Sequence, residues 1–371
     1  MNTPDRKIRA EIAAHGEISF ARFMELALYC PDCGFYEREK DTIGRRGDFH
    51  TSVSVGPLFG ELLAFQFSEW FSECGTDRLQ IVEAGAHDGR LARDILNWLK
   101  LRRPALLEKI EYVIIEPSAK RQKWQQETLK EFDTRVCWHA ELSNLSSPLE
   151  GVIFANELLD AMPVHRVGWD AKKGGWFEWG VSLEGERFVW KRLSENSRFT
   201  FHVSRPSFQP PPELLAALPD GFTIDICPAA KDWWQHAASR LGRGKILTLD
   251  YGLEAEEFFA PHRADGTLRA YHRHHLTADV LANPGEQDLT AHVNFTVIRN
   301  AGEAASLKSE LDETQSKFLT RIAGRAWEKG SDFGEWTAAR TRQFQTLTHP
   351  EHMGRAFRVL VQTTGLSDCN S

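Results

Sequence analysis

The chain has 371 residues, enough for one large domain or two with a sizeable core. Its net charge of −7 argues against binding to a nucleic-acid backbone, which requires a basic face. No apolar run approaches the roughly 18 residues that a membrane-spanning helix needs. The N-terminus has neither the apolar core of a signal peptide nor the acid-free composition of a transit peptide. We therefore expect a cytoplasmic protein with no membrane span.

Six cysteines are scattered along the chain, which is not the pattern of a disulfide framework. Cys30 and Cys33 form a C-x-x-C sequence, but a zinc site would need two further ligands at suitable spacing. The histidines at 272, 274 and 275 lack a carboxylate or cysteine at helical spacing. We expect a turn with free thiols and no metal.

The first part of the chain is predicted to be helical and then irregular. Apolar residues recur at helical spacing over 4–30, and Ser19 is a candidate cap of the second helix there. Residues 34–57 are rich in glycine and charge, which is typical of a long functional loop. Residues 58–73 read as another helix.

An alternation of strands and helices follows, and it predicts a parallel sheet with right-handed crossovers. The strand candidates are 79–84, 111–116, 134–138 and 151–156, and the helix candidates between them are 89–101 and 119–131.

The second half of the chain is predicted to return to this sheet after an insertion. Residues 164–205 have a period of two with glycine turns, which indicates hairpins. A helix at 228–241 and strands at 245–250 and 357–365 then rejoin the sheet, while 260–290 look loop-like and 305–350 helical. The predicted division is an N-terminal helical segment with an active-site loop, a Rossmann-like core, an inserted hairpin region, and a second part of the core with helical additions, over residues 1–75, 76–165, 166–212 and 213–371.

The most informative stretch is a strand that ends at Glu83, a loop that contains Gly85, His87, Asp88 and Gly89, and a helix. Glycines in such a loop let the backbone approach a ligand closely. The G-x-G-x-x-G pattern of dinucleotide sites is missing, and the spacing fits better the looser E-x-G-x-G-x-G loop of S-adenosylmethionine (SAM) enzymes. The alternative is that the glycines only make a tight turn, and that His87 and Asp88 face solvent.

A second apolar run ends at Glu116, about thirty residues later. A carboxylate at the end of the second strand of such a unit can accept hydrogen bonds from both hydroxyls of a ribose. The strand, the glycine turn, the helix and this acid together predict a SAM site.

The fourth strand candidate ends at Asn156, and Glu157, Asp160 and His165 follow it. Two acids three residues apart suit an arginine guanidinium, which offers five fixed donors. They would hold the acceptor nitrogen near the sulfonium, so we expect catalysis mainly by positioning, with Asn156 and His165 on the substrate side. The alternative is that the acids cap a helix or form a surface ion pair. Tyr251 either lines the substrate mouth or is an ordinary turn residue.

Asp48 and Thr51 lie in the long loop, in the sequence GDFHTS. An acid beside hydroxyl groups can close over the amino-acid end of the cofactor, although an Asx-turn explains the same residues.

Seven motifs occur in an order that resembles the MidA family of SAM-dependent methyltransferases, which includes a mitochondrial assembly factor for respiratory complex I. They are GDFHTS…PLFGE, EAGAHDGRLARDIL, IIEPS, NELLDAMPVHR, LTLDYG, GTLRAY and DLTAHVNF, over residues 15–365. The resemblance implies a class I methyltransferase fold with added helices and hairpins, and methylation of a protein arginine.

By motif match, the resemblance places Gly85 and Gly89 at the cofactor, Glu116 at its ribose, and Glu157 with Asp160 at the substrate. It also places Asp48 and Thr51 near the site.

Three positions depart from the family pattern. His87 stands where a central glycine is usual, Val53-Ser54 where Pro-Glu is usual, and Asn294 where an aspartate is usual. We therefore keep three hypotheses. The first is a methyltransferase that acts on arginine of a protein partner. The second is a methyltransferase of a small molecule, with a pocket shaped by aromatic residues around 176–201. The third is a non-catalytic assembly or chaperone protein in which His87 blocks the cofactor. The oligomeric state stays open.

Overall fold

In this computed structural model, the structure describes residues 3–38, 51–72, 78–145, 148–194, 210–272, 275–351 and 353–364. A main sheet has the strand order β15-β16-β10-β5-β2-β3-β4, and β14 pairs with β10 beside it. Strands β2 to β5 and β10 are parallel, while β16 runs antiparallel to both β10 and β15. The bounds are β2 Leu79–Ala84, β3 Ile110–Ile115, β4 Val136–His139, β5 Leu149–Asn156, β10 Leu241–Leu253, β14 Val293–Asn294, β15 Leu307–Thr314 and β16 Phe357–Thr364. The predicted parallel α/β core is confirmed.

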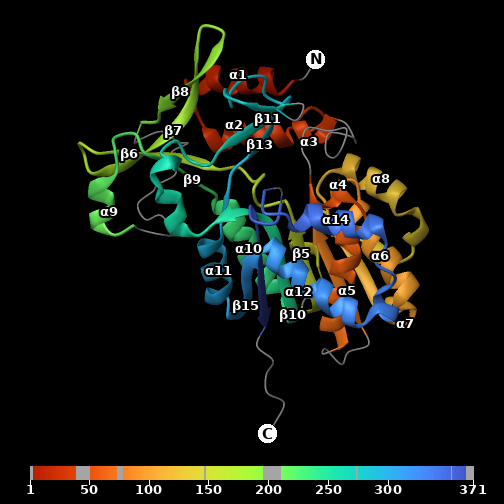
Figure 1. Ribbon diagram of the computed structural model, residues 1–371. Helices are drawn as coiled ribbons and strands as arrows, with labels where there is room; N and C mark the ends of the chain where they lie inside the picture. Colours follow the sequence, from red (N-terminus) through yellow and green to blue (C-terminus); the bar gives the residue numbers. More distant parts are fainter. Residues whose placement is uncertain are drawn as a thin grey trace.

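Helices cover both faces of the main sheet (Figure 1). Alternate residues of one strand face opposite sides, so Ile81 packs with α5, α6, α12 and α14 while Val82 packs with α10 and α11. The helix bounds are α4 Ser52–Val55, α5 Leu58–Ser72, α6 Arg90–Arg102, α7 Pro104–Leu107, α8 Ala119–Thr128, α9 Pro212–Ala217, α10 Pro228–Arg240, α11 Phe295–Ala304, α12 Gln315–Glu328, α13 Gly330–Phe333 and α14 Ala338–Thr348. None of the helices in these described segments is long and apolar enough to cross a membrane.

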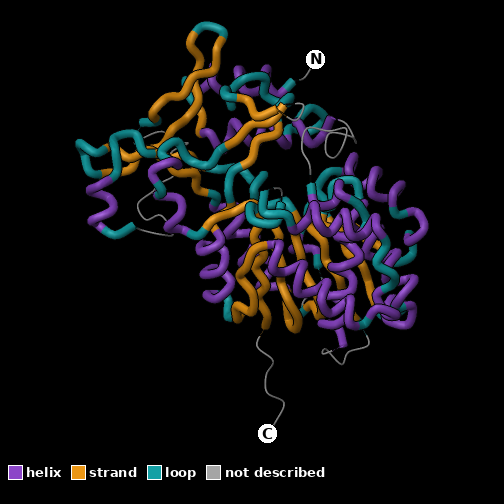
Figure 2. Tube along the Cα trace, viewed as in Figure 1, coloured by secondary structure: helices purple, strands orange, loops and turns teal. Residues whose placement is uncertain are grey.

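A second lobe lies above the carboxyl ends of the main sheet (Figures 1 and 2). Its larger sheet has the order β1-β7-β6-β9, with β8 paired to β7, and its smaller sheet has the order β12-β11-β13. Their bounds are β1 Ile18–Ser19, β6 His165–Asp170, β7 Gly175–Glu184, β8 Arg187–Arg192, β9 Thr223–Ile226, β11 Arg269–His272, β12 His275–Thr277 and β13 Asp288–Thr290. The hairpins expected after residue 164 are present.

Three N-terminal helices complete this lobe: α1 Pro4–His15, α2 Phe20–Tyr29 and α3 Phe35–Arg38. Ser19 caps α2 as expected, because its Oγ accepts a hydrogen bond from the backbone N–H of Arg22 at 3.2 Å. Together, α2 and α3 bring the N-terminal part of the chain over the edge of the main sheet where its parallel strands end.

Two sequence-based expectations are wrong. The region 305–350 is not all helical, because β15 occupies Leu307–Thr314 at the edge of the main sheet. Only Leu307 of that strand is buried, so the strand lacks the alternating apolar pattern from which a strand is predicted. The region 260–290 is not only loop, since it contains β11, β12 and β13; these strands are only three or four residues long.

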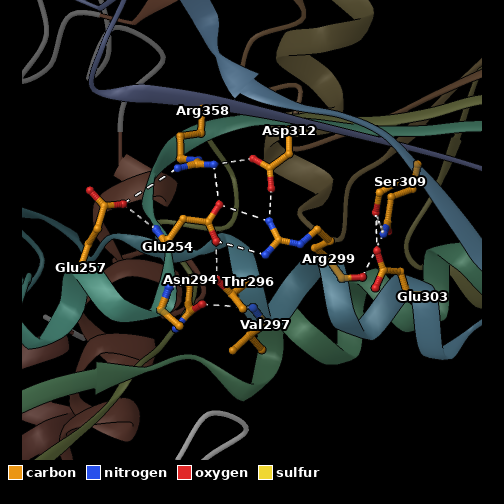
Figure 3. A network of polar contacts seen from close by, with 12 residues as sticks. Glu254, Glu257, Asn294, Thr296, Val297, Arg299, Glu303, Ser309, Asp312 and Arg358 are labelled. Carbon is orange, nitrogen blue, oxygen red and sulfur yellow. Dashed lines mark hydrogen bonds and ion pairs between the residues drawn. The ribbon is translucent and has the colours of Figure 1, made fainter. Parts of the chain in front are cut away.

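A network of charged side chains joins Glu254, which directly follows β10, to α11, β15 and β16 (Figure 3). Arg358 contacts Glu254 at 2.6 Å and Asp312 at 2.5 Å, and Arg299 contacts both acids as well. Beside the network, Asn294 caps α11, with its Oδ1 accepting from the N–H of Val297 at 3.1 Å. An aspartate at 294 would make the same cap, so this departure from the family pattern has a structural explanation.

Candidate functional site

A cavity of about 490 Å³ is lined by residues at the carboxyl ends of β2, β3 and β5 and by residues of the second lobe. Ligands gather at this edge in open α/β sheets. Its lining brings together most of the predicted site residues, namely Thr51, Gly85, His87, Asp88, Glu116, Asn156, Glu157 and Asp160. Gly89, His165 and Tyr251 do not line it, and Asp48 lies outside the described residues.

The turn after β2 depends on left-handed backbone conformations. Gly85 has φ of +77°, and a Cβ there would lie 3.0 Å from the side chain of Leu158. Gly89 has φ of +83° and precedes α6 as its N-cap. His87 has φ of +46°, which explains why a glycine suits this position. Its ring lies at the cavity wall without filling the cavity.

Asp88 anchors the start of α6. It accepts from the N–H of Arg90 at 3.1 Å, and its other oxygen lies 2.7 Å from Nε of the same residue. Although burial acts to raise the pKa of Asp88, the hydrogen bond to His87 and the charges of His87 and Arg90 lower it on balance. The carboxylate is therefore ionised and neutralised locally.

Glu116 follows β3 and is held by several donors. The N–H of Ser118 and Nε of Arg121 donate to Oε1, each at 2.9 Å, and Nε2 of Gln125 donates to Oε2 at 3.1 Å. Burial raises the pKa of Glu116, while the charge of Arg121 and these hydrogen bonds oppose the rise. Three donors leave about one of the four lone-pair positions of a carboxylate for a ligand hydroxyl.

Glu157 sits at a strained position beyond β5, with φ of +51°. The N–H of Ser52 donates to its Oε1 at 3.0 Å, and Nδ2 of Asn156 donates to the same atom at 3.2 Å. Burial raises the pKa of Glu157 to about 8, even though these bonds oppose the rise.

Asp160 and Asp250 lie against one another below the same end of the cavity. Oδ2 of Asp250 accepts from the N–H groups of Leu158, Leu159 and Asp160, at 3.2, 2.8 and 3.4 Å. Asp250 therefore positions the segment that carries the predicted catalytic acids. Burial raises the pKa of Asp250 to about 7. Burial and the charges of Asp250 and Glu157 raise the pKa of Asp160 well above its usual range.

The sequence reasoning missed the wall contributed by the second lobe. Asp288 of β13 lines the cavity and accepts from Oη of Tyr36 at 2.7 Å. Tyr29 lies next to Tyr36, with ring centroids 5.5 Å apart, and donates to the carbonyl of Ala161 at 2.9 Å. No local spacing links these residues to the glycine turn; the DLTAHVNF motif was the one signal that pointed to Asp288.

Positive charge is unevenly distributed over the described lining. Its two arginines are Arg90, which pairs with Asp88, and Arg121, which pairs with Glu116. Both lie at the glycine-turn end. Two buried polar atoms of the lining, Oδ1 of Asn156 and Nε2 of His87, have no hydrogen-bond partner. A ligand with donors and acceptors would satisfy them.

The two remaining predicted substrate residues make contacts outside this lining, although burial and then the charges of Glu157 and Asp160 raise the pKa of Tyr251. Nδ1 of His165 lies 2.6 Å from Oε1 of Glu178 on the neighbouring strand β7. Tyr251 packs its ring on Phe357, with centroids 3.9 Å apart, in the core of the main sheet.

Ser54, the second part of the Val53-Ser54 departure, lines the cavity but also caps α4. Oγ of Thr51 accepts from the N–H of Ser54 at 3.2 Å, and Oγ of Ser54 accepts from the N–H of Thr51 at 3.1 Å. This is a capping box, in which a glutamate at the last position makes the same contact. The change therefore keeps the cap.

Known proteins match this architecture along most of the chain. Residues 62–311, more than half of the chain, match a family described as S-adenosyl-L-methionine-dependent methyltransferases. A protein from Burkholderia thailandensis, solved with S-adenosyl-homocysteine bound, is 31% identical with a TM-score of 0.81; the match covers 97% of this chain and 91% of that one. This likeness confirms the predicted class I methyltransferase fold and the use of SAM.

Curated relatives carry a more specific name. "Protein arginine methyltransferase NDUFAF7 homolog, mitochondrial" from Drosophila melanogaster is 28% identical, over 97% of this chain and 85% of its own length. The mouse protein of the corresponding name is 29% identical, over 95% of this chain and 82% of its own length. These names contradict our expectation of a cytoplasmic protein, because the relatives are named mitochondrial. That expectation rested only on the missing targeting pattern at the N-terminus. The family match and the shared fold show that the chain belongs to the MidA-type family of SAM-dependent methyltransferases.

Proposed function

We propose that this enzyme methylates an arginine side chain of a protein partner. The observation that carries the proposal is the acidic end of the cavity, where Glu157 and Asp160 lie close together, whereas the two arginines of the described lining pair with acids at the other end. A guanidinium would supply the missing positive charge and several hydrogen-bond donors. The relatives named protein arginine methyltransferases support the same acceptor.

The other end of the cavity suits the cofactor. We propose that the turn from Gly85 to Gly89 contacts its amino-acid part and that Glu116 accepts a hydrogen bond from its ribose. His87 and Asp88 belong to the same turn, and the unpartnered Nε2 of His87 offers a contact to the ligand. Thr51 closes the cavity from the α4 side, next to Glu157 through Ser52.

Bound SAM supplies an electrophilic methyl group, which passes to the acceptor nitrogen as the carbon–sulfur bond breaks and S-adenosyl-homocysteine is left. The acids of this chain then have two tasks. Glu157 and Asp160 hold the guanidinium so that one nitrogen faces the cofactor, and a neighbouring carboxylate takes the proton that this nitrogen loses. The pKa of about 8 at Glu157 suits proton uptake near neutral pH, and the pKa of Asp160 is raised in the same direction.

Isothermal titration with SAM and S-adenosyl-homocysteine tests the cofactor end. We expect micromolar binding that Glu116→Ala weakens by tenfold or more, because the ribose contact is lost. Glu131→Ala is the matched control, since Glu131 is exposed and pairs with Lys100 on the surface. Absence of binding by the unmutated protein would favour a non-catalytic scaffold.

A second assay separates the acceptor classes. Tritiated SAM is incubated with arginine-containing peptides, with the same peptides carrying lysine, and with a panel of small metabolites. We expect label in the arginine peptides. Label in metabolites alone would favour the small-molecule hypothesis, which the aromatic residues of β7 and β8 first suggested. The cofactor titration stands apart from this result, so failure of the acceptor proposal would still leave a SAM enzyme.

A further inference from the structure

The C-x-x-C turn between α2 and α3 brings two thiols into contact outside the methyltransferase site. The Sγ atoms of Cys30 and Cys33 lie 2.7 Å apart. The turn is fixed by hydrogen bonds from the N–H groups of Cys33 and Gly34 to the carbonyl of Cys30, at 3.1 and 2.7 Å. A side chain at Gly34 would collide with the carbonyl of Leu28, because a Cβ would lie 2.5 Å from that oxygen. The thiols therefore need no movement of the backbone to react with one another.

The surroundings give one thiol access to solvent and the other a cationic neighbour. Cys33 is partly exposed and lines a separate surface cavity of about 730 Å³, whereas Cys30 is 2% exposed. Lys7 of α1 hydrogen-bonds to Cys30, and this bond raises the pKa of the lysine. In the described part of the chain, no group of three or more histidine, cysteine or acidic side chains is arranged to hold a metal ion. Thiol chemistry therefore fits the turn better than a zinc site.

We propose that Cys30 and Cys33 form a redox-active pair that is oxidised to a disulfide by a low-molecular-weight disulfide such as oxidised glutathione. Burial and the hydrogen bond to Cys30 raise the pKa of Cys33 to about 11, so only a small fraction of Cys33 is thiolate, and its exposure is what makes it the first thiol to react. This thiolate attacks one sulfur of the reagent, which releases one glutathione thiol and leaves a mixed disulfide. The thiolate of Cys30 then attacks Sγ of Cys33 and displaces the second glutathione. Two protein thiols are oxidised, one glutathione disulfide is reduced to two thiols, and the two protons pass to the released thiols.

The position of the pair connects it to the cavity. Three and four residues after Cys33, α3 presents Tyr36 to Asp288 and Glu37 to Ser118, with Oγ of Ser118 donating to Glu37 at 2.8 Å. A disulfide in the turn would restrict the segment that delivers both side chains. We expect the amide protons of residues 34–38 to exchange several-fold more slowly in the oxidised protein than in the reduced one.

The test is an equilibration of the full protein in glutathione buffers, followed by acid quenching, alkylation and trypsin digestion. Cleavage after Arg22 and Arg38 releases one peptide that contains Cys30 and Cys33 and no other cysteine. We expect this peptide to become unalkylated and two mass units lighter in the folded protein. The concentration of oxidised glutathione that oxidises half of the pair should be on the order of tenfold lower for the folded protein than for the protein unfolded in urea, because folding holds the two thiols together.

Two controls make the outcome decisive. Cys30→Ser should trap glutathione on Cys33, which shows which thiol is attacked first. Cys137, whose thiol contacts Glu111 on the next strand, should remain alkylated under the same conditions. Equal glutathione requirements in folded and unfolded protein, or a folded protein that stops at the mixed disulfide, would overturn the proposal.

Discussion

Two pairs of acids at the two ends of the cavity have different neighbours. At the glycine-turn end, Asp88 lies 2.7 Å from Nε of Arg90 and Glu116 lies 2.9 Å from Nε of Arg121. At the far end, the neighbours of Asp160 are the acids Glu157, Asp250 and Asp288, and their charges raise its pKa in addition to burial.

This difference in neighbours has a consequence for binding. At one end the acids are neutralised by residues of the chain, and at the other end the ligand would have to neutralise them. A buried carboxylate needs a partner, and without one it takes up a proton. Asp88 and Glu116 at the glycine-turn end find cationic partners within the chain, so this end can receive a largely neutral ribose. Glu157 and Asp160 have no such cationic partner in the described lining, so a cationic acceptor would both bind there and drive these two acids to ionise.

The largest effect should come from removing charge at the acidic end. We expect Glu157→Gln and Asp160→Asn each to lower kcat/KM for an arginine peptide by roughly 100- to 1000-fold, because each removes a buried partner of the guanidinium. SAM affinity, measured by titration, should change by less than about threefold, since the cofactor end is intact.

Asp288→Asn should behave like these two variants, because Asp288 faces the same space from the second lobe. Glu286→Gln, at an exposed position two residues earlier, serves as the control and should leave kcat/KM unchanged. Methyl transfer that survives Glu157→Gln would show that the acids do not clamp the acceptor, and the contrast between the two ends would lose its functional meaning.

The pH dependence of stability should show the same contrast. The folded-state pKa of Glu157 is raised from 4.5 to about 8. Between these values the folded protein holds a proton that the unfolded chain has lost, so the stability that this proton provides disappears as the pH rises through about 8. We expect the free energy of unfolding of the unliganded enzyme to fall by on the order of a few kcal/mol from about pH 5 to about pH 9.

Urea unfolding across this range measures the slope. Other buried acids, such as Glu83 with a pKa of about 8, contribute to it, so the informative quantity is the difference between the unmutated protein and Glu157→Gln. The variant should have the shallower fall. Parallel curves for the two proteins would mean that Glu157 is already ionised in the empty site.

Local sequence patterns predicted much of the main sheet and one end of the cavity. The apolar run at 79–84 matches β2, and the turn from Gly85 to Gly89 follows it as expected. These features depend on contacts within a few residues. Glu116 was found for the same reason, since it ends the next strand of one strand–helix–strand unit.

The acidic end was only half predicted because its other half comes from distant segments. Tyr36 and Asp288 are 252 residues apart and meet because α2, which packs on α3, also contacts β13. His165 followed the acids in sequence, but the register of β6 on β7 directs it to Glu178. The local sequence pattern does not show which of these side chains face the cavity, because strand pairing in a sheet depends on residues that are distant in sequence.

A substitution of His87 tests whether SAM binding depends on the imidazole side chain as well as on the backbone of the glycine turn. Its φ of +46° is a conformation that glycine adopts without strain. We expect His87→Gly to stabilise the protein by up to ~1 kcal/mol and to change SAM affinity by less than about fivefold, because Arg90 still pairs with Asp88 and Glu116 keeps its donors. Urea unfolding and titration provide the two readouts. A loss of SAM affinity beyond about tenfold would show that the imidazole, whose Nε2 lacks a partner, contacts the cofactor directly.

Substitutions of Asn294 should change stability and activity least. They test whether this departure from the family pattern affects the acidic end of the cavity. The residue caps α11 beside the network of Glu254, Arg299 and Arg358 (Figure 3). Asn294→Asp keeps an acceptor for the N–H of Val297, so we expect a stability change within about 0.5 kcal/mol, whereas Asn294→Ala should cost ~1 kcal/mol. Neither should alter kcat/KM, because Asn294 does not line the cavity. An increase in methyl transfer by Asn294→Asp would mean that a negative charge at this cap influences the acceptor. Residues outside the lining of the cavity would then also contribute to acceptor binding.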